Sequence, residues 1–303
     1  MRSAALSRPL HHDGRTLVFL HVPKTAGTTL GWIIRRQYPQ SRTMDIQPDH
    51  MVDKYRKFLA LPEPARRGLR CLTGHIPYGM HRWLPQGARY VTMLRHPVDW
   101  TVSLHAFIQR MTFFDQDPDL AGFRSGRGLT LDAFVSFLAD AHLADMQTRL
   151  IAGQVGFETL LPPYAPLTSD ALDVAKRNLT EQCECVGIIE RFDESLLLMQ
   201  RRFNWRNVHY RPLNTGEGAG KETTLSPALR DRILAINSRD VALYDAARRR
   251  VESDIALLGE DFQRQLRRFR RRNALYVRLM PLYEASGLSR VRGFLRRTLE
   301  TAR

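Results

Sequence analysis

A lysine, a glycine and three threonines follow a short apolar run near the start of the chain. The run Val18–Val22 is typical of a buried strand, and an amphipathic helix begins near Leu30. Between them lies Pro23-Lys24-Thr25-Ala26-Gly27-Thr28-Thr29. Backbone N–H groups at such a strand-to-helix turn, together with the helix dipole, form a site for a phosphate or sulfate. Since Lys24 adds a full positive charge, the turn is predicted to bind an anion.

A second cation and a histidine follow two further predicted strands. The run Arg89–Leu94 is rich in β-branched and aromatic residues, and it stops at Arg95-His96-Pro97, where a helix is expected to begin. An arginine at a strand end can pair with a phosphate through two hydrogen bonds, and Ser103, on the helix, can donate from its hydroxyl. His75 follows a predicted strand at 70–74, and histidine titrates near neutral pH, the range of a general base.

The elements that must position these residues alternate between strands and helices. Further strands are predicted at 44–46, 184–188 and 206–209, and helices at 49–59, 97–110, 130–140, 143–152, 169–181, 194–203 and 226–258. This alternation favours an α/β fold with a mostly parallel sheet, in which ligands bind outside the carboxyl ends of the strands. Lys24, His75 and Arg95 are therefore expected along one edge of the sheet.

The three motifs resemble those of sulfotransferases. Residues 23–29 are similar to the 5′-phosphosulfate loop of the heparan sulfate 2-O-sulfotransferase family and its bacterial relatives, with Ala26 in place of the first glycine of the typical loop. The segment lacks the Gly-x-x-x-x-Gly-Lys-Ser/Thr pattern of nucleoside-triphosphate loops. Arg95 and Ser103 have the spacing of the family's 3′-phosphate motif. Leu72–Gly79 is similar to its Gly-His segment, in which the histidine is the catalytic base.

The similarity extends weakly to residues 145–153 and 186–193. It implies a P-loop NTPase-like α/β domain at 14–258 that transfers a sulfuryl group from 3′-phosphoadenylyl sulfate to a hydroxyl of a carbohydrate or glycolipid acceptor. In an in-line displacement, His75 would accept the proton and Lys24 would neutralise charge on the leaving phosphate. No metal is predicted. The residues that the resemblance implies for nucleotide binding are Lys24, Thr25, Ala26, Gly27, Thr28, Thr29, Arg95, Ser103, Asn214 and Lys221.

Several alternatives stay open at the level of sequence. His75 could be a structural histidine, with His105 as the reserve base, and the glycine-rich segment 211–224 could be an ordinary surface loop rather than a cover for the nucleotide. The alternative functions are a P-loop-like nucleotide kinase and a non-catalytic basic protein that binds nucleotides or nucleic acid. No helix-turn-helix, zinc or RNA-binding signature supports nucleic-acid binding. By analogy with the relatives, Arg110, Arg124 and Arg127 could meet an anionic sugar, and a lipid-linked glycan or another hydroxylated metabolite fits as an acceptor equally well.

The net charge of +15 is unevenly distributed, because residues 259–303 hold twelve arginines and only four acidic residues. This basic C-terminal tail is predicted to be helical. It could lie on an anionic membrane surface or an acidic polymer, or it could pack an apolar stripe against the domain. The absence of an apolar run of ~20 residues or of a secretory signal leads us to expect a cytoplasmic protein, with contact at the inner membrane surface.

The chain has three cysteines, Cys71, Cys183 and Cys185. An odd number with a Cys-x-Cys pair gives no disulfide framework, and further ligands at metal-binding spacing do not accompany them. They are predicted to be small buried residues, since free cysteine packs as a modest hydrophobic group.

Overall fold

A computed structural model describes residues 13–47, 49–110, 121–155, 164–212 and 225–285. Its centre is a sheet in the order β2-β3-β1-β4-β5, in which every neighbouring pair is parallel. The predicted α/β architecture with a mostly parallel sheet is therefore confirmed. The strands are β1 (Thr16–Leu20), β2 (Thr43–Ile46), β3 (Cys71–Gly74), β4 (Ala88–Leu94) and β5 (Cys183–Ile188).

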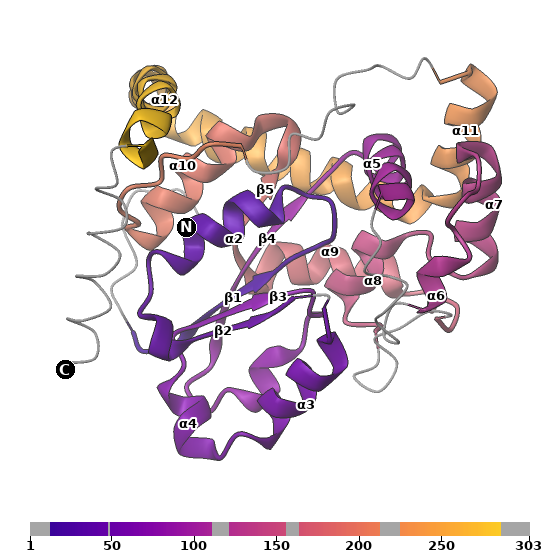
Figure 1. Ribbon diagram of the computed structural model, residues 1–303, viewed down its shortest axis with the longest axis horizontal. Helices are drawn as coiled ribbons and strands as arrows, with labels where there is room; N and C mark the ends of the chain where they lie inside the picture. The colour runs from indigo at the N-terminus through magenta and orange to yellow at the C-terminus, as the bar shows by residue number, and fades with distance from the viewer. Residues whose placement is uncertain (1–12, 48, 111–120, 156–163, 213–224, 286–303) are drawn as a thin grey trace.

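Helices lie on both sides of the sheet (Figure 1). All residues of β1 are buried, as expected for a central parallel strand that is covered on both faces. The helices are α2 (Gly27–Arg35), α3 (Met51–Ala60), α4 (Glu63–Gly68), α5 (Pro97–Arg110), α6 (Ala121–Arg124), α7 (Leu131–Asp140), α8 (Met146–Ala152), α9 (Ala171–Arg177), α10 (Phe192–Phe203), α11 (Pro227–Ile236) and α12 (Ser238–Ala285).

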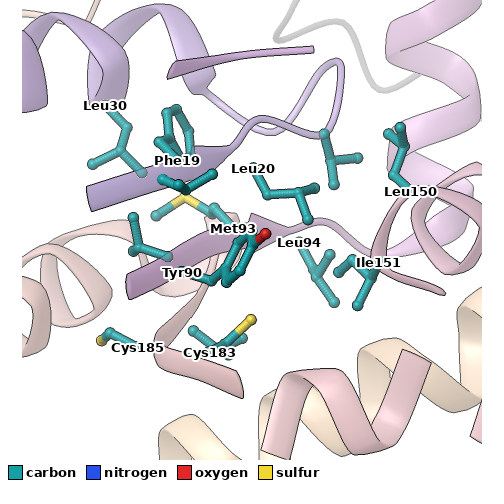
Figure 2. Packing of buried hydrophobic residues seen from close by; sticks show 14 of the residues in the cluster. Phe19, Leu20, Leu30, Tyr90, Met93, Leu94, Leu150, Ile151, Cys183 and Cys185 are labelled. Carbon is teal, nitrogen blue, oxygen red and sulfur yellow. The ribbon is translucent and has the colours of Figure 1, made fainter. Parts of the chain in front are cut away.

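The hydrophobic core fills the space between the sheet and these helices. Figure 2 shows Phe19 of β1 and Met93 of β4 in one cluster with Cys183 and Cys185 of β5. Cys71 is also buried, and all three thiols are free, so the prediction for the cysteines is confirmed. Burial raises the pKa of the Cys183 and Cys185 thiols to about 12, which leaves them protonated and unreactive at neutral pH.

The strand predicted at 206–209 is wrong. A side chain of the segment after α2, rather than a neighbouring strand, satisfies the backbone there. Gln37 Nε2 donates to the Arg206 carbonyl at 2.8 Å, and Gln37 Oε1 accepts from the Arg206 N–H at 2.9 Å. Asn207 then adopts a left-handed conformation with φ 51°, which interrupts an extended strand. Val208 is nevertheless buried, which explains its apolar character.

The last helix continues past residue 258 and is interrupted at Gly259, where φ is 59° and ψ is −149°. Beyond this break, Phe262, Leu266 and Phe269 are buried in the main core. The described part of the basic tail is therefore helical and packs against the domain. The boundary between 14–258 and 259–303 stays a prediction, and residues 286–303 lie outside the described part of the chain. None of the helices among the described residues is long and apolar enough to cross a bilayer.

Candidate functional site

The order of the strands brings three loops to one edge of the sheet. β1 lies between β3 and β4, and Leu20 at the end of β1 is in register with Gly74 on one side and Thr92 on the other. The loop after β1 carries Lys24, while His75 and Arg95 directly follow β3 and β4. The structure therefore places the three predicted residues at the same edge, with Lys24 in the loop that follows the central strand, as expected for a ligand site of a parallel sheet.

The loop after β1 is held in a left-handed turn. Lys24 has φ 63° and Ala26, which precedes the first residue of α2, has φ 59°. The Thr25 hydroxyl donates to the Val22 carbonyl at 2.7 Å, and Trp100 Nε1 donates to the Pro23 carbonyl at 2.8 Å. Since the Thr25 hydroxyl already donates inside the loop, what Thr25 can offer an anion as a donor is its backbone N–H.

The α2 helix begins at Gly27 and turns its positive end toward this edge of the sheet. The N–H groups of a first helical turn point toward the N-terminus of the helix, and those of Gly27, Thr28 and Thr29 therefore face this edge of the sheet. The loop and the first turn are the place where the sequence predicts a phosphate or sulfate.

Cations gather around the Lys24 side chain. Its Nζ lies 4.0 Å from the centroid of the Phe107 ring. Burial, together with the charges of Arg110 and Arg95, lowers the pKa of Lys24 to about 8. Among the described residues, no carboxylate forms an ion pair with Lys24 or Arg95. An anion at this point would relieve the repulsion between the cations.

His75 is positioned by the glycine that precedes it. Gly74 has φ 143°, and a Cβ atom there would lie 2.1 Å from the Ile46 carbonyl oxygen, so only glycine fits. The His75 N–H donates to the same carbonyl at 2.9 Å. The imidazole is partly exposed, and burial together with the charge of Lys24 lowers its pKa to about 4. A neutral His75 can therefore accept a proton at neutral pH.

A second histidine, which the sequence reasoning missed, lies beside His75. The ring centroids of His21 and His75 are 4.2 Å apart. His21 is 6% exposed, and a Cβ atom at Gly27 would lie 1.6 Å from its Nε2 atom. Burial and the neighbouring His75 lower the pKa of His21 well below its usual value, so this ring is also neutral. Its place at the end of the first strand, inside the motif, was the available sequence signal.

Arg95 has an unused donor group. Its Nη1 atom donates to the Lys24 carbonyl at 3.2 Å, whereas its buried Nε has no hydrogen-bond partner among the described residues. A buried N–H group without a partner is unfavourable, and a phosphate oxygen could accept from it. Ser103 lies partly exposed on α5, the helix that follows this turn. The assignment of Arg95 and Ser103 to a 3′-phosphate stays a prediction.

The remaining predicted residues have mixed outcomes. His105 Nε2 lies 2.8 Å from the Leu129 carbonyl oxygen and its ring packs on Phe134, so it is occupied in a structural role. Arg110 is close enough for its charge to lower the pKa of Lys24. Arg124 and Arg127 are exposed on and after α6. Asn214 and Lys221 lie outside the described residues.

No group of three or more His, Cys, Asp or Glu side chains in the described ranges is arranged to hold a metal ion. The site therefore offers cations, N–H groups and neutral imidazoles, a set of groups suited to an anionic ligand with a reacting hydroxyl.

Comparison with known proteins agrees with this geometry. The family model for galactose-3-O-sulfotransferase matches residues 3–282. Galactose-3-O-sulfotransferase 3 is 30% identical in Bos taurus and 29% identical in Homo sapiens, over 86% of this chain and 64% of each relative. Heparan-sulfate 6-O-sulfotransferase 3-B of Danio rerio is 25% identical over 83% of this chain and 66% of the relative.

Among solved structures, mouse sulfotransferase SULT7A1 complexed with PAP aligns with a TM-score of 0.36 and 13% identity, covering 67% of this chain and 64% of that chain. This chain spans 64% of the length of the bovine and human relatives. The resemblance to sulfotransferases is confirmed by the family match, which covers most of the chain. The chain belongs to the galactose-3-O-sulfotransferase family.

Proposed function

We propose that this protein transfers a sulfuryl group from 3′-phosphoadenylyl sulfate to a carbohydrate hydroxyl. The observation that carries the proposal is the order of groups at the sheet edge. The adjacent strands β3, β1 and β4 are followed by His75, Lys24 and Arg95 respectively. A base, a cation on an anion-binding loop and a second phosphate site thus lie on three adjacent strands. One nucleotide with phosphates at both its 5′ and 3′ ends would fill both anion sites.

The 5′-phosphosulfate fits the loop after β1. The N–H groups at the start of α2 would hold the 5′-phosphate, and Arg95 with Ser103 would hold the 3′-phosphate. The segment 213–224, with Asn214 and Lys221, is proposed to contribute further contacts to the nucleotide. This placement also supports a P-loop NTPase-like arrangement, in which a helix that follows the first strand presents its N-terminus to a phosphate.

In the reaction, the acceptor hydroxyl oxygen attacks sulfur in line with the bond to the 5′-phosphate. His75 accepts the hydroxyl proton as the new S–O bond forms and the bond between sulfur and the phosphate oxygen breaks. Lys24 neutralises the charge that develops on that leaving oxygen. The mechanism is supported by the protonation states of both groups: at neutral pH His75 is neutral and can accept a proton, and Lys24, with a pKa of about 8, carries a positive charge.

A carbohydrate acceptor is supported by the relatives, which are named for sulfation of galactose or heparan sulfate. The exposed Arg110, whose charge reaches Lys24, is suited to an acceptor that already carries negative charge. A nucleotide kinase is disfavoured because the loop lacks the Walker lysine spacing.

The proposal is tested by incubating the protein with 3′-phosphoadenylyl sulfate and a panel of neutral and acidic oligosaccharides. Mass spectrometry of the products should show a sulfated oligosaccharide formed together with adenosine 3′,5′-bisphosphate. ATP in place of the donor should give no product. Phosphorylation of an oligosaccharide from ATP would overturn the proposal in favour of the kinase.

The basic face of α12 supports an additional proposal, contact with an anionic membrane. Leu275 and Leu279 are 56% and 48% exposed, and by helical spacing they lie away from the buried Phe262 and Phe269 and beside exposed arginines. Apolar side chains among arginines suit a bilayer with anionic lipids better than they suit a polar polysaccharide. The arginines of this face are Arg267, Arg268, Arg271 and Arg272.

Co-sedimentation with vesicles tests this contact on the full chain. Binding to vesicles that contain phosphatidylserine should exceed binding to phosphatidylcholine alone, and it should weaken in high salt. Leu275→Ser with Leu279→Ser should reduce it, while Leu257→Ser, at an equally exposed leucine before the Gly259 break, should not. Equal sedimentation of all three proteins would overturn the proposal. The cytoplasmic location stays a prediction.

A further inference from the structure

Two segments that the proposed function leaves without a role hold the backbone of Arg95 and His96. Gln147, from 145–153, accepts a hydrogen bond from the Arg95 N–H through Oε1 at 3.0 Å and donates to the Arg95 carbonyl through Nε2 at 2.9 Å. Glu190, from 186–193, accepts from the His96 N–H through Oε1 at 2.8 Å. Both segments resemble sulfotransferases only weakly in sequence, yet both contact the same turn.

Gln147 is itself fixed by a reciprocal cap between two helices. The N–H groups of Gln147 and Thr148, in the first turn of α8, donate to the Asp240 carboxylate at 3.1 and 2.7 Å. The Asp240 N–H, in the first turn of α12, donates to the carboxylate of Asp145 at 2.9 Å. Each carboxylate thus caps the other helix. All four residues are buried, and Gln147 is 0% exposed, so its carboxamide cannot turn away from Arg95.

Glu190 is fixed from the same helix. The Tyr244 hydroxyl donates to Glu190 Oε2 at 3.0 Å, and Tyr244 lies one turn along α12 from Asp240. The Tyr244 ring also packs edge-on against the His96 ring, with centroids 5.4 Å apart. α12 therefore supports both side chains that hold the turn after β4.

The hold on the backbone adds to the few interactions of the Arg95 guanidinium, which include the charges of Asp99 and Glu190. Its one hydrogen bond among the described residues is to the Lys24 carbonyl, and its Nε is unpartnered. A backbone clamped on both sides of Arg95 limits where that guanidinium can go before a ligand arrives. A side chain that is already ordered before the ligand arrives loses less conformational entropy on binding, and this preorganisation strengthens the affinity.

We propose that Gln147 and Glu190 are positioning residues, which fix the Arg95–His96 turn so that the Arg95 guanidinium is set for the 3′-phosphate of the nucleotide. The inference rests on the proposed function. It goes further by assigning affinity for one specific phosphate to side chains that do not touch the nucleotide.

A double-mutant cycle separates this role from a general structural one. Calorimetry would measure the Kd of adenosine 3′,5′-bisphosphate and of adenosine 5′-phosphate for the wild type, Gln147→Met, Arg95→Ala and the double variant. Gln147→Met should weaken binding of the bisphosphate by about tenfold and leave the 5′-phosphate nearly unchanged. In the Arg95→Ala background, Gln147→Met should not further change the ratio of the Kd of adenosine 5′-phosphate to the Kd of adenosine 3′,5′-bisphosphate.

Two more variants make the test robust. Gln154→Met removes a glutamine that bridges the N–H and the hydroxyl of Thr168, a loss of two hydrogen bonds that do not involve Arg95, and it should leave the ratio unchanged. Glu190→Ala should lower the ratio of the Kd of adenosine 5′-phosphate to the Kd of adenosine 3′,5′-bisphosphate. Glu190→Gln, which keeps an acceptor for the His96 N–H, should restore most of this ratio. Glu190→Ala also gives the answer if Gln147→Met does not fold.

Two results would overturn the assignment. One is equal weakening of both ligands by Gln147→Met, and the other is an undiminished effect in the Arg95→Ala background. A wild type that binds both ligands equally tightly would instead refute the proposed function itself, because no 3′-phosphate site would then exist.

Discussion

The loop after β1 and the turn after β4 both offer a cation at the same sheet edge, but they are built differently. The Lys24 loop is shaped in part by neighbours in sequence, such as the Thr25 hydroxyl on the Val22 carbonyl, and is also held by Trp100 Nε1 on the Pro23 carbonyl. The Arg95 turn is held by side chains 52 and 94 residues later in the chain. Burial lowers the pKa of Lys24 and His75, and it also lowers the pKa of Arg95, where the charges of Asp99 and Glu190 oppose the shift.

This difference suggests a division of work. The Lys24 loop, where Lys24 is repelled by the charges of Arg95 and Arg110, is suited to a reaction that needs a cation beside a neutral base. A clamped turn is suited to holding a ligand in one place. We therefore expect variants of Lys24 and His75 to change turnover, and variants at the turn to change the preference for a nucleotide with a 3′-phosphate.

The largest expected effect is at His75. His75→Ala should lower kcat by about 10²–10⁴, because the attacking hydroxyl loses its base. The Kd of adenosine 3′,5′-bisphosphate should be unchanged. Steady-state kinetics and calorimetry on the same preparation check both. His105→Ala is the matched control, since this ring contacts Leu129 and Phe134 instead. A kcat loss for His105→Ala as large as that for His75→Ala would contradict the assignment of His75 as the base.

Gly27→Ala should damage the loop itself. A Cβ atom 1.6 Å from His21 Nε2 must displace the ring or the helix N-terminus, a change that costs about 1–3 kcal/mol in a packed site. Both nucleotides should bind more weakly by a similar factor. Gly68→Ala, where a Cβ atom meets nothing within 4 Å, is the control. Adding His21→Ala should recover part of the lost affinity, and a complete lack of recovery would show that His21 is not the obstacle.

The pH dependence of kcat/KM should have two limbs. Activity should fall as the pH drops through about 4, because His75 then becomes protonated and cannot accept a proton. It should also fall as the pH rises through about 8, because Lys24 then loses its charge. Lys24→Arg keeps its charge over this range and should remove the alkaline limb from the residual activity. If the alkaline limb persists in Lys24→Arg, the limb reports the titration of a group other than Lys24.

The smallest expected effect is a gain in stability from Ala26→Gly. Ala26 has φ 59°, a left-handed conformation that costs a non-glycine residue roughly 1–2 kcal/mol. Because glycine also makes the unfolded chain more flexible, the net gain should be about 0.5–1 kcal/mol in urea unfolding. Ala141→Gly, at φ −84°, should not stabilise the protein. A loss of stability for Ala26→Gly would show that the loop is not strained at this residue.

The sequence was sufficient for features that neighbouring residues determine. The anion-binding turn, the strand ends and the Gly74-His75 pair follow from residue types within a few positions. His21 could have been found from its place in the motif, but its contact with Gly27 depends on the packing of α2 on β1. Gln147 and Glu190 could not be assigned, because their partners are far away in sequence and their bonds go to backbone atoms, which leave no pattern of side-chain types.

The predicted strand at 206–209 failed for the same reason. Its apolar Val208 is typical of a strand, but the hydrogen-bond partner of its backbone is the side chain of Gln37. Local propensity identifies a buried segment and cannot say which group will satisfy its backbone.

The most direct test measures turnover and binding together in Lys24→Ala and Arg95→Ala. The account predicts that Lys24→Ala, with saturating 3′-phosphoadenylyl sulfate, loses about 10²-fold or more in kcat while it still binds adenosine 3′,5′-bisphosphate more tightly than adenosine 5′-phosphate. Arg95→Ala should lose that preference and keep most of its turnover at saturation. The opposite pattern, with the preference lost in Lys24→Ala and turnover lost in Arg95→Ala, would contradict it.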